Sequence, residues 1–199
     1  MNYEISFERV SKSFGSHTVL RDVDFRITPG RVHALLGRNG AGKSTLFSIF
    51  LGLLAADSGT VRVAGAPWSR GVLDHVGASV NGPAFYGHLS AAANLRVHTR
   101  LLGLPESEIE RVLAIVGLNG AGKKKAKSFS TGMKARLALG QALLGDPEIL
   151  VLDEPQNGLD PQGIVELREL LQKLAGAGHT VIVSSHPVSY THLTLPTKA

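Results

Sequence analysis

Apolar and polar positions alternate in two stretches near the N-terminus, at residues 3–10 and 18–28. Alternation from one residue to the next is typical of strands with one buried face, and Pro29-Gly30 closes the second stretch with a turn signal. We therefore predict two antiparallel strands joined by a turn.

Two later runs, at residues 32–36 and 149–152, are almost wholly apolar, which is typical of strands covered on both faces, and a last strand is expected at residues 180–185. Shorter strands are expected at residues 59–64 and 75–80. Helical spacing of apolar residues follows the first buried run and fills much of the middle of the chain, and Pro161 marks the start of a later helix.

Strands separated by helices predict an α/β fold with a parallel sheet. The antiparallel strands form a separate β part at the N-terminus. We expect one domain over residues 1–186, in which the β-rich parts 1–80 and 146–186 form the core and residues 81–145 form a helical insertion.

Composition excludes several classes of protein. With 43% hydrophobic and 19% charged residues, the 199-residue chain can bury a core and is neither disordered nor collagen-like. It has no cysteine, so disulfide scaffolds, iron–sulfur clusters and thiol catalysis are excluded. The formal charge of +5 permits an anionic ligand without requiring a nucleic acid. No apolar run approaches the length of a membrane span, so we expect a soluble or peripheral protein.

A phosphate-binding sequence lies where the first buried strand ends and a helix begins. Residues 37–45 read Gly-Arg-Asn-Gly-Ala-Gly-Lys-Ser-Thr and match GxxxxGK followed by Ser or Thr. A plain glycine-rich turn would explain the glycines but not the Lys-Ser pair. The match predicts a P-loop of a nucleoside triphosphatase, with ATP and Mg²⁺ as ligands. Its expected binding residues are Gly37, Asn39, Gly40, Ala41, Gly42, Lys43, Ser44 and Thr45, of which Ser44 also offers a hydroxyl to the metal.

A second loop, at residues 117–124, repeats the spacing and the string Asn-Gly-Ala-Gly-Lys. It has Lys124 where the hydroxyl should be, and it follows an amphipathic helix instead of a buried strand. We predict a helix end and an exposed loop. The lysines nearby could contact anionic lipid or nucleic acid, but a solvated charge run is the commoner explanation.

Two carboxylates, Asp153 and Glu154, directly follow the apolar run at 149–152. Ligands bind at the carboxyl ends of parallel strands, so Asp153 is expected to hold Mg²⁺ and Glu154 to orient or deprotonate the attacking water. His186 follows the strand expected at 180–185 and would lie at the same edge of the sheet. Acidic residues also end strands for solubility alone, and the upstream P-loop favours the catalytic interpretation.

In order along the chain, the segments GRNGAGKST, FSTGM, ILVLDEP, NGLDP and SSH together resemble the ATP-binding cassette (ABC) family over residues 1–186. The resemblance implies an ATPase that works as a dimer. Ser130 and Gly132 would then grip the terminal phosphate of ATP held by the opposite subunit, and Asp160 would communicate across the dimer. Phe14 would stack on adenine, and His186 would contact the terminal phosphate.

The sequence departs from the common family pattern in two places, the signature loop and the position of a glutamine common to most relatives. Thr131 and Met133 give a signature loop similar to that of the branch serving drug, bacteriocin and antimicrobial-peptide export or self-immunity. Asn81 stands where most relatives carry a glutamine that binds magnesium. Two interpretations of Asn81 remain open: a nucleotide-site residue that binds Mg²⁺, or a turn asparagine before Gly82-Pro83.

Residues 187–199 change abruptly in character and resemble a translated transposase adaptor used in preparing sequencing libraries. We therefore expect a non-native tail after His186 and a chain truncated at that point.

The resemblance implies an ATP-binding and ATP-hydrolysing subunit that powers export. Its expected partners are a separate membrane-spanning permease and a second nucleotide-binding subunit, homo- or heterodimeric, and its expected place is the cytoplasmic face of the membrane. Alternatives are a soluble ABC ATPase acting on ribosomes or nucleic acid, and an inactive truncated cassette. Nucleic acid is disfavoured, because no arginine-rich or aromatic-interleaved basic surface is present in the sequence.

Overall fold

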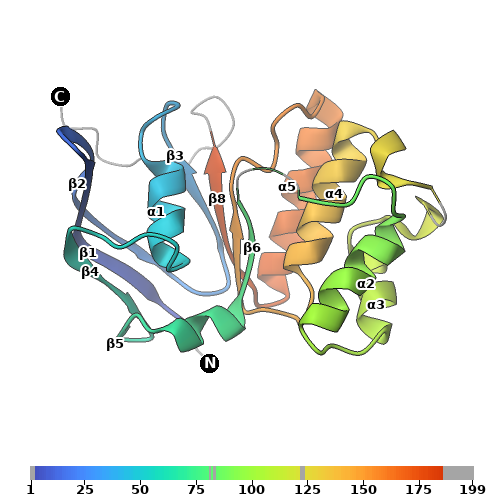
Figure 1. The fold of residues 1–199 in the computed structure, drawn as a ribbon, viewed down its shortest axis with the longest axis horizontal. Coiled ribbons are helices and arrows are strands. Elements are labelled where there is room, and N and C mark those ends of the chain that lie inside the picture. The colour runs from blue at the N-terminus through green and yellow to red at the C-terminus, as the bar shows by residue number, and fades with distance from the viewer. Residues whose placement is uncertain (1–2, 81, 83, 122–123, 186–199) are drawn as a thin grey trace.

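Two sheets of four strands each form the frame of the molecule in a computed structural model, which describes residues 3–80, 82, 84–121 and 124–185 (Figure 1). One sheet is antiparallel with the order β2-β1-β4-β5, and the other is parallel with the order β3-β8-β7-β6. The antiparallel strands are β1 (Ile5–Phe14), β2 (His17–Ile27), β4 (Ser58–Val63) and β5 (Ala66–Pro67). The parallel strands are β3 (Val32–Leu36), β6 (Val76–Ser79), β7 (Ile149–Leu152) and β8 (Thr180–Ser185).

The helices α4 (Thr131–Ala142) and α5 (Pro161–Gly176) each begin directly after a residue whose side chain caps the helix. Ser130 Oγ accepts a hydrogen bond from Met133 N at the start of α4, and Asp160 Oδ1 accepts one from Gly163 N at the start of α5. In the described part of the chain, no helix is long and apolar enough to cross a membrane. The α-helices are α1 (Lys43–Phe50), α2 (Ala91–Leu101), α3 (Ser107–Ile115), α4 (Thr131–Ala142) and α5 (Pro161–Gly176). Short 3-10 helices are η1 (Arg70–His75), η2 (Asn119–Ala121) and η3 (Ala126–Ser128).

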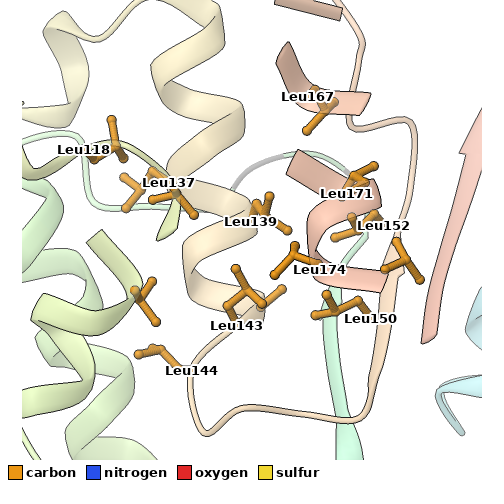
Figure 2. Packing of buried hydrophobic residues seen from close by; sticks show 14 of the residues in the cluster. Leu118, Leu137, Leu139, Leu143, Leu144, Leu150, Leu152, Leu167, Leu171 and Leu174 are labelled. Atoms are coloured by element: carbon orange, nitrogen blue, oxygen red, sulfur yellow. The ribbon is translucent and has the colours of Figure 1, made fainter. Parts of the chain in front are cut away.

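The parallel sheet is buried on both faces, and each face belongs to a different core. Ile149 and Val151 of β7 pack with α1 and the antiparallel sheet, whereas Leu150 and Leu152 pack with α4 and α5. Figure 1 shows α1 between the two sheets, with α2 to α5 on the other side of the parallel sheet. Figure 2 shows leucines of α4 and α5 meeting Leu150 and Leu152 in the second core. Continuous apolar strands are the result of burial on both faces.

The predicted fold class is confirmed, and β3, β7 and β8 have the predicted bounds. β1 continues to Phe14, beyond the predicted end at residue 10, because register shifts disrupt its alternation. The strand β5 and the helix η1 were not predicted, since two residues of strand leave no periodic signal. The division into a core and a helical insertion remains a prediction.

Candidate functional site

The loop after β3 lies between the two sheets and leads directly into α1. Gly37 N donates to Ser185 O of the neighbouring strand β8 at 3.3 Å. Gly40 and Gly42 have positive φ angles of 80° and 88°. A Cβ added at Gly42 would lie 2.6 Å from Leu20 Cδ2, so glycine allows the loop to pass close to β2. This strand–loop–helix arrangement turns backbone amides toward a common point at the start of α1.

Lys43 carries its charge into the middle of this loop. Its Nζ donates to Gly37 O at 2.8 Å and to Arg38 O at 3.2 Å, and it lies 3.4 Å from Glu154 Oε1. The residue is only 5% exposed. A buried ammonium needs partners of this kind, and a phosphate oxygen would be a stronger partner than a carbonyl.

Oxygen donors suited to a divalent cation meet beside Lys43. Ser44 Oγ donates to Asp153 Oδ2 at 2.8 Å, and Ser184 Oγ donates to Asp153 Oδ1 at 2.5 Å. The backbone N of Asp153 donates to Ser79 O of β6 at 2.8 Å. Hydroxyl and carboxylate oxygens are the ligands that Mg²⁺ prefers, so this donor set fits the metal.

Glu154 is held in an unusual backbone conformation. Its φ is 48°, a left-handed value that costs a non-glycine residue about 1 kcal/mol or more. Its N donates to Ser184 Oγ at 2.7 Å, and its Oε2 accepts a hydrogen bond from Asn157 Nδ2. These contacts direct the carboxylate toward Lys43. Such strain is concentrated at functional sites.

Two cavities share Ser44 and Glu154. One, of about 340 Å³, is lined by the P-loop, by Glu154, and by His17 and Val19 of β2. The other, of about 370 Å³, lies between the ends of β6 and β7 and the start of α4, where Thr131 is part of its wall. The structure thus joins the P-loop, the acidic pair and β2 around one site.

The remaining predicted residues lie apart from this cradle or outside the description. Phe14 is 51% exposed at the β1–β2 turn, where it pairs with His17. Ser130 and Gly132 are at the start of α4 and are not among the residues lining the two cavities. Asp160 caps α5. Asn81, His186 and the tail at 187–199 lie outside the described residues.

Several residues of the site were not predicted. Ser184 contacts both Asp153 and the backbone of Glu154, and Asn157 donates to the Glu154 carboxylate. Gln156 is buried and donates through Nε2 to Ser185 Oγ. Polar residues at the carboxyl end of an apolar strand were a usable signal for the two serines. Asn157 and Gln156 lie in a loop without periodicity, where the sequence carried no such signal.

The fold and the cradle define a P-loop nucleotide-binding protein. The ABC transporter family matches residues 20–157 of the chain. The lantibiotic transport ATP-binding protein SrtF of Streptococcus pyogenes is 43% identical over 185 residues, covering 93% of this chain and 81% of that protein. The bacitracin transport ATP-binding protein BcrA of Enterococcus faecalis is 39% identical, covering 95% of this chain and 63% of that protein. The chain therefore belongs to the ABC transporter family.

Solved structures agree with this assignment. The structure of cbiO1 from Clostridium perfringens, part of the ABC transporter complex cbiONQ, has a TM-score of 0.85 and 28% sequence identity. The match covers 94% of this chain and 80% of the cbiO1 chain. The predicted family and the predicted ATPase activity are confirmed: this is an ATP-binding subunit that hydrolyses ATP. Members of the family bind ATP, generally with Mg²⁺, and such subunits pair with membrane permeases. The comparisons give no support to a ribosome- or nucleic-acid-directed ATPase.

Proposed function

We propose that this chain powers the export of antimicrobial peptides or related antibiotics through a separate membrane-spanning permease, at the cytoplasmic face of the membrane. The names of its relatives, which refer to lantibiotic and bacitracin transport, support this substrate class. The variant signature loop with Thr131 and Met133 also favours that branch of the family. The ATP-hydrolysing part of the proposal depends on one observation, the convergence of Lys43, Ser44, Asp153 and Glu154 around two cavities that share Ser44 and Glu154.

The P-loop binds the phosphates of ATP. Backbone amides from Gly37 to Thr45, with Asn39, Gly40, Ala41 and Gly42 between them, surround the anion, and the start of α1 adds partial positive charge. Lys43 Nζ exchanges its carbonyl partners for oxygens of the terminal phosphates. Phe14 supplies a ring for the adenine base from the neighbouring hairpin.

Ser44 and Asp153 would hold Mg²⁺ through their side-chain oxygens. Bound there, the ion would supply positive charge beside the phosphate oxygens during phosphoryl transfer. Ser184 keeps the Asp153 carboxylate in place through its hydroxyl. Asn81 is proposed either to bind the metal as well or to serve only as a turn residue.

Glu154 orients or deprotonates the attacking water. Asn157 and Ser184 fix its carboxylate and its backbone, so little rearrangement is needed when the water is bound. His186, the next residue in the sequence after β8, is proposed to contact the terminal phosphate.

A second copy or a related subunit completes the site. Ser130 and Gly132 lie at the start of α4, and the first amides of a helix can bind an anion. A Cβ added at Gly158 would lie 3.2 Å from Thr131 Cγ2, so the loop that carries Asp160 packs on the signature loop. This contact supports a joint role of the two loops across a dimer.

The test is the substitution Glu154→Gln. It preserves shape but removes the base, so ATP binding is expected to remain while hydrolysis falls by about a hundredfold or more. The variant is also expected to remain as a closed dimer with ATP, measured by light scattering.

The matched control is Glu148→Gln, at the opposite end of β7, where Glu148 pairs with His75 at 3.1 Å. This variant is expected to keep wild-type turnover. Unchanged turnover in Glu154→Gln would contradict the assignment of Glu154 as the base. Loss of turnover in both variants would indicate a general effect on β7.

A further inference from the structure

The end of β1 that carries Phe14 is irregularly paired. The register between β1 and β2 shifts between Phe7 and Val10, between Val10 and Lys12, and again between Lys12 and Ser13. At each shift the backbone hydrogen bonds between the two strands are interrupted, so strand pairing fixes the positions of the following side chains less firmly. Contacts other than this pairing are therefore needed to position Phe14.

Asp57, directly before β4, contacts this end of β1 at three points. Its Oδ1 accepts from Lys12 Nζ at 2.6 Å, and its Oδ2 accepts from Ser13 N at 2.7 Å. Its own backbone N donates to Ser11 O at 2.9 Å. The hydrogen bond from Lys12, followed by that from Ser13, lowers the pKa of Asp57 below its ordinary value, because both stabilise the ionised carboxylate.

Lys12 joins Asp57 to the aromatic ring. Its Nζ lies over the Phe14 ring, 5.8 Å from the centroid, within the range of a cation–π contact. The Lys12 side chain is only 13% exposed, whereas Phe14 is 51% exposed. Carboxylate, ammonium and ring thus form a chain of contacts that orients the ring and leaves about half of its surface accessible.

The same hairpin borders the phosphate cradle. Phe14 pairs with His17 across the turn, and His17 lines the cavity formed by the P-loop. A Cβ added at Gly42 would lie 3.1 Å from Val19 O, which shows how closely β2 approaches the loop. A change in the position of the hairpin therefore changes the place of the ring relative to bound phosphates.

We propose that Asp57 is a positioning residue of the nucleotide site, which acts through Lys12 and Ser13 to hold the Phe14 ring where the adenine base of ATP stacks. The proposal rests on the proposed function of Phe14. Asp57 then contributes to the binding of the adenine base and not to the binding of the phosphates. The expected effect is on the affinity for ATP, and a ligand without a base separates it from an effect on folding.

The experiment compares two ligands in the presence of Mg²⁺: ATP, and inorganic tripolyphosphate, which has no base. Dissociation constants are measured by displacement of a fluorescent ATP analogue from wild type, Asp57→Asn and Lys12→Met. The control is Glu4→Gln, which removes another exposed carboxylate next to the same strand, 3.7 Å from Arg26. Thermal unfolding of each variant reports on the fold.

Asp57→Asn and Lys12→Met are each expected to weaken ATP binding about three- to tenfold, a part of the contribution of one stacked base. Tripolyphosphate binding and the control variant are expected to match wild type. In a Phe14→Ala background, Asp57→Asn should have no further effect on ATP, because the ring through which it acts is gone.

Equal weakening of both ligands would overturn the proposal and indicate a structural role, as would an undiminished effect in the Phe14→Ala background. Unchanged ATP affinity in both variants would also overturn it. If Asp57→Asn fails to fold, Lys12→Met alone decides between these outcomes. Wild-type protein that binds tripolyphosphate and ATP equally would instead contradict the proposed role of Phe14.

Discussion

Two loops of this chain contain the string Asn-Gly-Ala-Gly-Lys, at residues 39–43 and 119–123, but only the first has the surroundings of a phosphate cradle. The first follows the buried strand β3 and enters α1. The second follows α3 and forms the short helix η2. Identical residues therefore serve different purposes, according to the elements that flank them.

The glycines show the difference at the level of the backbone. Gly40 has a φ of 80°, whereas the matching Gly120 lies in η2 and has no such left-handed angle. Both loops use one amide locally, since Ala41 N donates to Arg38 O at 3.1 Å and the matching Ala121 N donates to Leu118 O at 2.9 Å. In the second loop Lys124 N also donates to Ala121 O at 2.8 Å, so the amide that matches that of Ser44 is not available to an anion.

A cradle also needs a helix start to which the loop leads. α1 begins at Lys43, directly after Gly42. After the second loop, the next described helix is the three-residue η3 at Ala126–Ser128. The lesson is that the spacing of a motif predicts a site only together with the strand before it and the helix after it.

The largest expected contrast is between the two lysines of the repeated string. Lys43→Ala is expected to weaken ATP binding by about a hundredfold, because a charge-assisted contact to phosphate is lost. Lys123→Ala, at the matching position outside the described residues, is expected to leave the affinity unchanged. Titration calorimetry with ATP and Mg²⁺ measures both, and an equal loss in the two variants would contradict the distinction between the loops.

A smaller contrast, of opposite sign, is expected between the matching glycines. Gly40→Ala is expected to lower the free energy of unfolding by about 1 kcal/mol, because a side chain is strained at that φ. Gly120→Ala is expected to raise it by about 0.5 kcal/mol, since an added Cβ meets nothing within 4 Å there. Urea unfolding checks both values. A similar loss of unfolding free energy in both variants would mean that Gly120 has the same left-handed backbone conformation as Gly40.

The smallest expected effect tests whether the motif alone makes a site. Lys124→Ser completes the string GxxxxGKS in the second loop, yet we expect the chain still to bind one ATP. Calorimetric stoichiometry provides the measurement, and Ser44→Ala serves as the reverse control, with weakened Mg²⁺-dependent binding at the true loop. A second equivalent of bound ATP in Lys124→Ser would show that sequence spacing outweighs the flanking elements.

Much of the fold was predictable because its signals are local. The bounds of β3 and β7 agree with the apolar runs, since burial on both faces leaves a continuous pattern. The bulged end of β1 was predicted too short, because register shifts break the alternation that marks a strand.

The sequence by itself determined the strand and helix periods, the P-loop string, the acidic pair after β7 and the family. The tertiary structure alone decided the contacts between distant residues. Ser44 and Asp153 are 109 positions apart, and Lys12 and Asp57 are 45 apart. Periodicity reports only which face of an element is buried, and it carries no information on which distant side chain completes a hydrogen bond. For that reason the roles of Ser184, Asn157 and Asp57 emerged only once the sheets and the P-loop had been brought together.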